Sequence, residues 1–202
     1  MMDVKRARVA WRGCLLILAV GLAVTGCANR PSGPRAPVGD EARPPLVFQL
    51  GQVEIVDESA AGATASDLSG AFAIPPNQAL RNWAATRLHE QDGRPGILRF
   101  HMTEAEAVRT PLVGTPGVKG WFTRDQAERV EITFAGRLEA RRNDGSLIAS
   151  ATARAAAHRT FAEKTAPAER RAGLEALQAT ALAEFDREME GRIREDMAGV
   201  LD

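Results

Sequence analysis

Two alternating segments flank a short turn and form the clearest pattern of apolar and polar positions in the chain. Apolar residues recur at alternate positions through 130–140 and again through 147–157, with mostly polar residues between them. Such alternation is typical of strands that bury one face. The intervening sequence contains Asp144-Gly145, which favours a two-residue hairpin turn. This turn predicts the apolar pairs Ala140 with Ala149, Leu138 with Ala151, Phe134 with Ala155 and Ile132 with Ala157, and the polar pair Glu131 with His158.

Two other segments have the wider apolar spacing of amphipathic helices. Pro75-Pro76 opens a predicted helix that runs to about Glu90, with an apolar stripe of Leu80, Trp83, Ala84 and Leu88. A second helix is predicted from Thr165 or Ala166 to about Ala198, with a stripe of Leu174, Leu177, Ala181, Phe185, Met189, Ile193 and Met197. The small alanines at 149–157 would let this helix pack close to the hairpin. Because its stripe is longer than a short sheet covers, we expect the last turns to project and meet a partner helix.

Two further strands each carry a change in the parity of their apolar positions. In Leu46–Val56 the change falls at Gly51, and this predicts a bulge within one strand. In Ile97–Arg109 the inward residues Leu98, Phe100 and Met102 give way to Ala105 and Ala107, which predicts a second bulge. The element order is therefore β-α-β-β-β-α. It predicts an α+β two-layer sandwich, in which two helices cover one face of a four-stranded, antiparallel-rich sheet.

The connector 111–127 is long and contains the apolar pair Trp121-Phe122. Loops of this length without secondary structure are usually functional or disordered. Two interpretations fit the apolar pair: it inserts into a bilayer or a partner protein, or it folds back as a flap over the sheet. The glycines of this loop do not have the spacing of a phosphate-binding loop.

The N-terminus combines a basic start, an apolar run over 14–24 and small residues before Cys27. The run is too short to span a bilayer, for which a helix needs about 20 residues. This arrangement predicts a secretory signal over residues 1–26 rather than a buried helix, because polar, proline-rich sequence follows at once. Residues 27–45 contain five prolines and are predicted to be a solvated tether before a single domain at 46–202.

The tetrad Val24-Thr25-Gly26-Cys27 resembles the lipobox of bacterial lipoproteins. The resemblance implies transfer of diacylglycerol to the Cys27 thiol, cleavage between Gly26 and Cys27, and acylation of the new amino terminus, for example with palmitate. Several acyl chains make membrane anchoring lasting. Ala28 stands where an aspartate would retain an enteric lipoprotein at the inner membrane. The resemblance therefore favours the periplasmic face of the outer membrane.

Composition narrows the function classes further. The loss of residues 1–26 removes Cys14, four basic residues and one acid, which leaves 22 basic and 25 acidic residues and no free thiol once Cys27 is lipidated. A nucleic-acid partner, which calls for a basic face, is not expected. The three histidines have no metal-ligand spacing, and no nucleophile elbow, zinc motif or dinucleotide fingerprint occurs. We therefore expect no enzyme activity, no metal and no cofactor.

Three sets of residues allow a functional as well as a purely structural interpretation. Glu104 and Glu106 share a strand face, as acid–base catalysis requires, but a solvated face is the favoured explanation because no partner chemistry is nearby in the sequence. His158 opposite Glu131 is half of a possible proton-transfer or metal site, or a solvated cross-strand pair. Trp83 is a ligand contact or, as its spacing favours, a core residue.

The chain after Cys27 resembles, in element order and lipobox, a set of small outer-membrane lipoproteins. These are the lipopolysaccharide-assembly lipoprotein, the YajG-like lipoproteins and the auxiliary lipoproteins of ABC-type lipid transporters. The resemblance implies a non-catalytic envelope accessory that binds a protein partner in lipid transport or outer-membrane assembly. The alternative is a lipid-binding lipoprotein with a pocket under the 111–127 loop.

Overall fold

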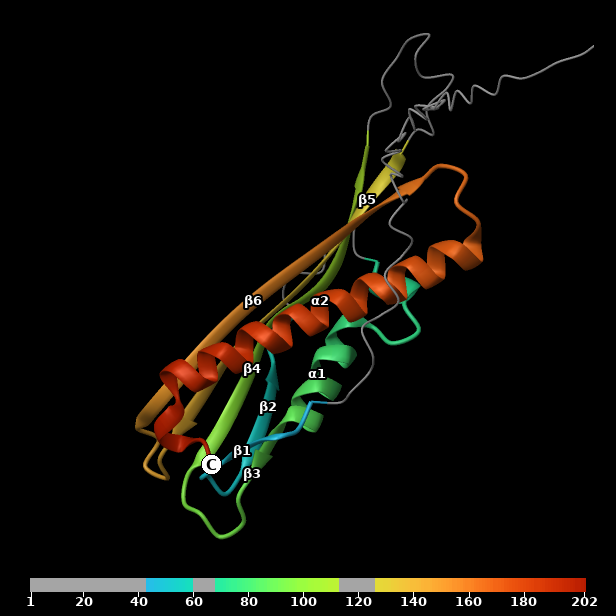
Figure 1. Cartoon of the computed structure of the whole chain (residues 1–202). Coiled ribbons are helices and arrows are strands. Elements are labelled where there is room, and N and C mark those ends of the chain that lie inside the picture. The colour runs from blue at the N-terminus through green and yellow to red at the C-terminus, as the bar shows by residue number, and fades with distance from the viewer. Residues whose placement is uncertain (1–42, 60–67, 113–125) are drawn as a thin grey trace, which may run out of the picture. The chain divides into compact units, whose positions relative to one another are not determined.

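The computed structural model describes residues 43–59, 68–112 and 126–202 (Figure 1). In chain order its elements are β1 (Leu46–Phe48), β2 (Val53–Asp57), η2 (Ser69–Ala71), α1 (Pro76–Arg87), β3 (Leu88–Glu90), β4 (Ile97–Pro111), β5 (Gln126–Arg141), β6 (Leu147–Ala162), α2 (Pro167–Asp196) and η4 (Ala198–Val200). The predicted α+β class and β-α-β-β-β-α order are confirmed. The short strands β1 and β3 form an additional two-stranded parallel sheet.

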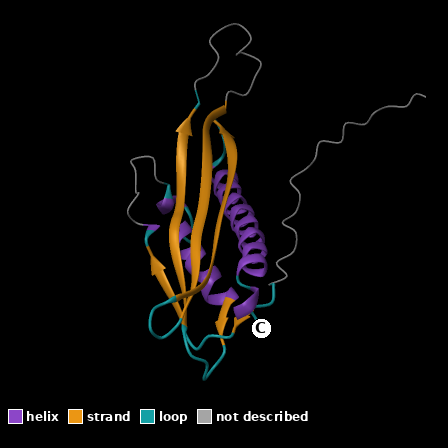
Figure 2. Ribbon diagram, turned by 90° about the vertical axis from the view of Figure 1, so that its left-hand side faces the viewer, coloured by secondary structure: helices purple, strands orange, loops and turns teal. Residues whose placement is uncertain are grey.

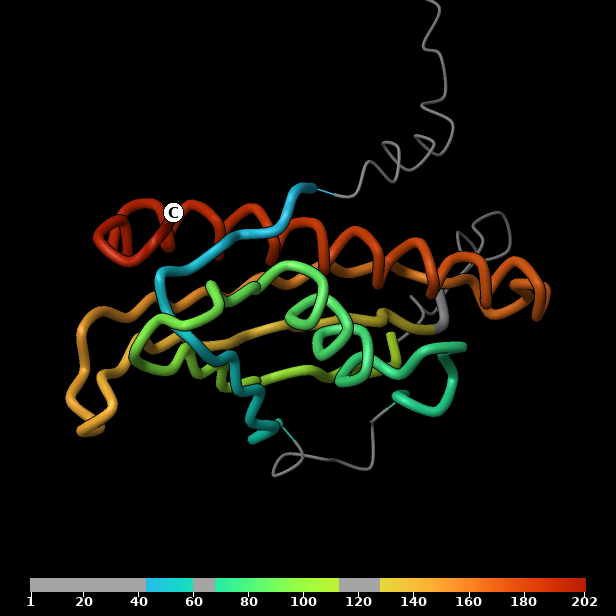
Figure 3. The backbone as a smooth tube through the Cα atoms, turned by 90° about the horizontal axis from the view of Figure 1, so that it is seen from below, coloured from blue at the N-terminus to red at the C-terminus, as the bar shows by residue number. Residues whose placement is uncertain are grey.

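The main sheet has the strand order β2-β4-β5-β6. β2 runs parallel to β4, whereas β4 with β5 and β5 with β6 are antiparallel. Figure 2 shows both helices on the same side of the long strands. In Figure 3, α2 runs alongside β6, and α1 lies near β4. One face of the sheet therefore carries both helices, as predicted, and no helix of the described residues covers the other.

The hairpin between β5 and β6 has the predicted register, but its turn is longer than predicted. Ala140 pairs with Ala149, Leu138 with Ala151 and Glu131 with His158. At the turn, Gly145 N donates to Arg142 O and Arg142 N donates to Ser146 O. Gly145 has a φ of +84°, so a three-residue turn ending in a left-handed glycine replaces the two-residue turn. A register shift next to Ala140 restores the predicted pairing.

The predicted bulge in β4 is confirmed, whereas the one at Gly51 is wrong. The β4–β5 register shifts between Met102 and Glu104, and Ala105 and Ala107 are buried. At Gly51, however, the chain leaves one sheet for the other, because β1 pairs with β3 and β2 with β4. A Cβ at Gly51 would lie 2.0 Å from Arg94 O, so only glycine fits against this backbone. α1 ends at Arg87, before the predicted Glu90, because Leu88–Glu90 form β3 and pair with β1.

Three aromatic rings join the two helices to the sheet. The Trp83 ring of α1 lies 5.5 Å from that of Phe100 on β4 and 4.9 Å from that of Phe185 on α2. Phe100 and Phe185 are fully buried. Trp83 Nε1 donates to Asp186 Oδ1 at 2.9 Å, so its polar atom is satisfied inside the domain. Trp83 is thus a core residue, as its helical spacing indicated.

The end of α2 does not project, contrary to expectation. Met189, Ile193 and Met197 are fully buried, because η4 turns the chain back toward β1. Leu201 forms a bridge with Phe48, and Asp202 N donates to Val47 O. A strand was predicted over Leu46–Val56, but not its position beside the end of α2, so the apolar stripe was expected to extend beyond the sheet.

A buried ion network joins α1, α2 and the first described residues. Arg87 Nε donates to Asp186 Oδ1 at 2.7 Å, and Arg87 Nη2 donates to Glu190 Oε2 at 2.8 Å. Arg43 reaches both carboxylates, and Arg87 also donates to the Pro44 carbonyl. Along α2, Glu188 pairs with Arg192 and Glu190 with Arg194, each four residues apart. Glu190 is therefore shared between an exposed pair and the network.

Gly136 on β5 provides a test of packing in the sheet. A Cβ at this position would lie 2.5 Å from the buried Phe100 ring. We expect Gly136→Ala to lower the free energy of unfolding by about 1–3 kcal/mol, since the ring must leave its position. Urea unfolding measures this change. In the control Gly191→Ala, where nothing lies within 4 Å, a stabilisation of about 0.5–1 kcal/mol is expected. Equal stability of the two variants would contradict the packing at Phe100.

Candidate functional site

The outer face of the main sheet carries a dense array of charged side chains. Alternation along the strands directs the apolar residues to the helices and the intervening residues to this face. Before the bulge in β4 the odd-numbered residues Arg99 and His101 point outward, and after it the even-numbered residues Glu104 and Glu106 do so. The charged side chains therefore stay on the same face along the whole strand. The outward charged residues are Glu54 on β2, Arg99, His101, Glu104 and Glu106 on β4, Arg129, Glu131, Arg137, Glu139 and Arg141 on β5, and Arg154 and His158 on β6.

Glu139 is the central carboxylate of this face. Its side chain is 9% exposed and lies 2.7 Å from Arg141 Nη2 and 3.1 Å from Arg137 Nε. His101 Nε2 lies 3.7 Å away, while His101 Nδ1 is 2.7 Å from Glu58 Oε1. Burial acts to raise the pKa of Glu139, but the hydrogen bond from Arg141 and the charges of Arg137, Arg141 and His101 outweigh it and lower the pKa below its ordinary value. Glu139 is therefore an ionised, positionally fixed group.

The lowered pKa of Glu139 gives a prediction for pH dependence. A carboxylate whose folded-state pKa lies below its unfolded value stabilises the fold above the unfolded pKa and loses that contribution as pH falls through the folded pKa. We expect Glu139→Gln to cost about 1 kcal/mol at neutral pH, and the difference from the wild type to shrink as pH falls below about 4.3 and through the lowered pKa of Glu139. Urea unfolding across this range measures it. A difference that stays constant or grows in acid would contradict the ion-pair arrangement, and Arg141→Gln should reduce the pH-dependent part.

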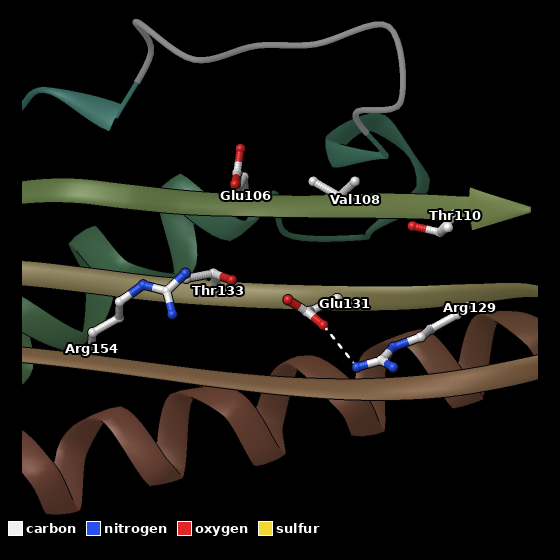
Figure 4. Close-up of a pocket in the computed structure, with 7 residues that line it drawn as sticks. All are labelled: Glu106, Val108, Thr110, Arg129, Glu131, Thr133 and Arg154. Carbon is white, nitrogen blue, oxygen red and sulfur yellow. Dashed lines mark hydrogen bonds and ion pairs between the residues drawn. The ribbon is translucent and has the colours of Figure 1, made fainter.

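A shallow groove lies further along the same face, toward the end of β4 (Figure 4). It has a volume of about 200 Å³ and is lined by Glu106, Val108, Thr110, Arg129, Glu131, Thr133 and Arg154. Arg129 is 3.0 Å from Glu131, and Arg154 is 3.1 Å from Glu104. The groove offers hydroxyl, guanidinium and carboxylate groups within a short distance. Such a surface can make polar and charged contacts.

The candidates for acid–base or metal chemistry, Glu104, Glu106 and His158, all lie on the outer face of the sheet. Glu104 and Glu106 share the outer face, where Glu104 pairs with Arg154 and Glu106 lines the groove. His158 is the cross-strand neighbour of Glu131, which pairs with Arg129. Within the described ranges, no group of histidine, cysteine and acidic residues has the arrangement of a metal site. Glu104 and Glu131 therefore each take part in an ion pair on the sheet face.

Several predicted site residues lie outside the described residues. These are the lipidation residue Cys27, the cleavage residue Gly26 and the contact pair Trp121-Phe122. The grouping of Glu139 with Arg137, Arg141 and His101 was not predicted. The alternating charges of β5 were visible in the sequence, but the β4–β5 register was needed to bring His101 beside them.

No family model and no curated protein matches the chain. Among the described residues, no helix is long and apolar enough to cross a membrane.

Proposed function

We propose that this protein is a lipid-anchored lipoprotein of the bacterial cell envelope that acts as a non-catalytic accessory and binds a partner protein. The observation that carries the proposal is Cys27 directly after a signal-like segment and small residues, followed by a proline-rich stretch. Lipid transport and outer-membrane assembly are the processes in which we place it. The periplasmic face of the outer membrane is the proposed location, because Ala28 follows the cysteine.

The arrangement of the described domain supports a binding role. Its interior is filled by large side chains, among them Phe100, Phe134 and Phe185, all fully buried. None of the described helices covers the outer sheet face, which carries the Glu139 cluster and the groove. Arg43 and Pro44, the last part of the predicted 27–45 tether, are bound to α1 and α2 on the opposite side of the sheet. A tether that joins the domain there leaves the charged face free for a partner.

The lipid-binding alternative depends on the loop 111–127, of which residues 113–125 lie outside the described residues. No observation on the described residues favours it, so it stays a prediction. A bound lipid found by mass spectrometry of the purified protein would support it.

The anchoring part of the proposal is tested with Cys27→Ser. We expect the wild-type protein in the membrane fraction and the variant unprocessed or released, because the thiol is the acceptor of the lipid. Cell fractionation with immunoblotting measures both forms, and Cys14→Ser serves as the matched control that should behave as the wild type. A Cys27→Ser protein that is processed and retained normally would refute the lipid anchor.

The binding part of the proposal needs a separate experiment. Cross-linking in cells followed by purification of the solubilised wild-type protein should recover an envelope protein. Charge reversal at the outer face, in Arg137→Glu, should reduce that recovery, whereas Arg187→Glu on the exposed side of α2 should not. Recovery of no envelope protein, or equal recovery with both variants, would argue against a binding role for this face.

A further inference from the structure

The β6 strand forms a long edge of the main sheet. It has 16 residues, Leu147–Ala162, and pairs only with β5 in the order β2-β4-β5-β6. At about 3.4 Å per residue it extends for about 50 Å. In an antiparallel edge strand, about half of the backbone N–H and C=O groups point away from the sheet. Between its two irregular ends, β6 pairs continuously with β5 from Ala149 to Phe161.

The opposite edge is protected by other parts of the chain, whereas no strand of the described residues pairs with the outer edge of β6. β2 has only five residues, and beyond it the free side of β4 receives hydrogen bonds from Glu58 N to Met102 O and from Leu68 N to Ala107 O. From the parts of the chain that the structure describes, no backbone hydrogen bond other than those of the β5 ladder reaches residues 149–161. β6 also contains no proline, a residue that commonly blocks edge strands.

The charge of β6 indicates which kind of strand can pair with it. The strand carries Arg154, His158 and Arg159 and has no acidic residue, while its other positions are mostly alanine, serine and threonine. The Arg154 side chain is 58% exposed and has one carboxylate neighbour, Glu104. Arg159 lies over the Phe161 ring and has no carboxylate within ion-pair distance in the described residues. A strand added to this edge would meet small side chains and positive charge.

A second copy of the chain does not suit this edge. Two antiparallel β6 strands that overlap along most of their length bring Arg154 of one copy near Arg154 of the other, with no acid on either strand. Like charges at facing positions destabilise strand pairs. An acidic strand has the complementary charge, because opposite charges at facing positions stabilise the pair.

From these observations we propose that β6 binds an extended, acidic segment of a partner protein, which adds to the sheet as a fifth strand beside β6. Backbone hydrogen bonds would supply affinity, and the arginines would select acidic side chains, as in other cases of strand addition. The proposal rests on the binding role in the proposed function and deepens it, because it names the edge of the sheet that the partner would contact. It does not depend on lipidation of Cys27.

The test uses the full chain in detergent and a synthetic peptide of about 10 residues, long enough to form a strand. The peptide alternates valine and threonine, with glutamate at every fourth position, and a second peptide has lysine at those positions. We expect the glutamate peptide to bind in calorimetry, more weakly at high salt, and the lysine peptide not to bind. Bound peptide should slow hydrogen exchange at about half of the β6 amides and leave β2 unchanged.

Charge reversal provides the matched variants. Arg154→Glu should weaken binding of the glutamate peptide by about tenfold and improve binding of the lysine peptide, since an attractive facing pair becomes repulsive. Arg187→Glu, on the exposed side of α2, should change neither affinity. An unfolded variant would lose affinity for both peptides. A gain of affinity for the lysine peptide in Arg154→Glu therefore shows that the variant is folded.

Three results would overturn the proposal. They are no binding of the glutamate peptide at low salt, binding without protection of β6, and a β6-mediated dimer of the free protein. Any of them would leave the lipid anchor intact if Cys27→Ser is still lost from the membrane. Conversely, a peptide that binds β6 in a protein whose Cys27→Ser form stays in the membrane would refute the anchor alone.

Discussion

Asp186→Ala is expected to lower the free energy of unfolding by about 3–5 kcal/mol, because it leaves two buried donors, Arg87 Nε and Trp83 Nε1, without their acceptor and leaves the Arg87 charge with Glu190 alone. Asp186 accepts hydrogen bonds from Arg87 Nε and Trp83 Nε1 and lies 3.2 Å from Arg43 Nε. The Arg87 side chain is 5% exposed and that of Asp186 11%, so water cannot replace the lost carboxylate. Urea unfolding monitored by tryptophan fluorescence measures the loss.

Two controls separate the buried network from surface ion pairs. Asp186→Asn keeps an acceptor oxygen for Arg87 and Trp83, so its loss should be smaller than that of Asp186→Ala. Glu188→Ala removes the exposed pair with Arg192 and should cost no more than about 0.5 kcal/mol. If Asp186→Ala were as mild as Glu188→Ala, the network would not join the two helices as described.

Phe185→Ala is the second change with a large expected effect, about 3–5 kcal/mol of unfolding free energy. The Phe185 ring is fully buried and lies 4.9 Å from the Trp83 ring and 6.4 Å from the Phe100 ring. Removing it leaves a cavity where α1, α2 and the sheet meet, and these elements cannot close it without losing other contacts. Thermal and urea unfolding both report the change.

The matched control for Phe185→Ala is Leu147→Ala. Leu147 is also a large apolar residue, but it is 49% exposed at the start of β6, so its removal should cost less than about 0.5 kcal/mol. Comparable losses in both variants would show that the ring cluster does not join the helices to the sheet.

The sheet and helices were predictable because each has a regular pattern over many residues. The alternating residues of β5 and β6 determine their register, since a shift by one position would expose the apolar face. The stripe from Leu174 to Met197 is buried throughout, which confirms the predicted face of α2. The parity change in Ile97–Arg109 likewise identified the bulge in β4.

The errors arose where distant segments meet. The parity change at Gly51 has the same sequence pattern as a bulge, but the close approach of Arg94 O makes it a crossing between sheets. The return of Leu201 to Phe48 covers the end of α2 and could not be read from a helical pattern. The Arg87–Asp186 network and the surroundings of Glu139 also join residues from separate elements. Periodicity along one segment carries no information on such contacts.

The intact mass of the protein purified from membranes tests the central claim most directly. A lipoprotein processed at the predicted site begins at Cys27, and its mass equals that of residues 27–202 plus a diacylglyceryl group and an amide-linked acyl chain. Release of fatty acids by alkaline hydrolysis should remove the ester-linked part of that excess. A mature protein without added lipid mass, or one cleaved at another residue, would contradict the lipid-anchored accessory proposed for this chain.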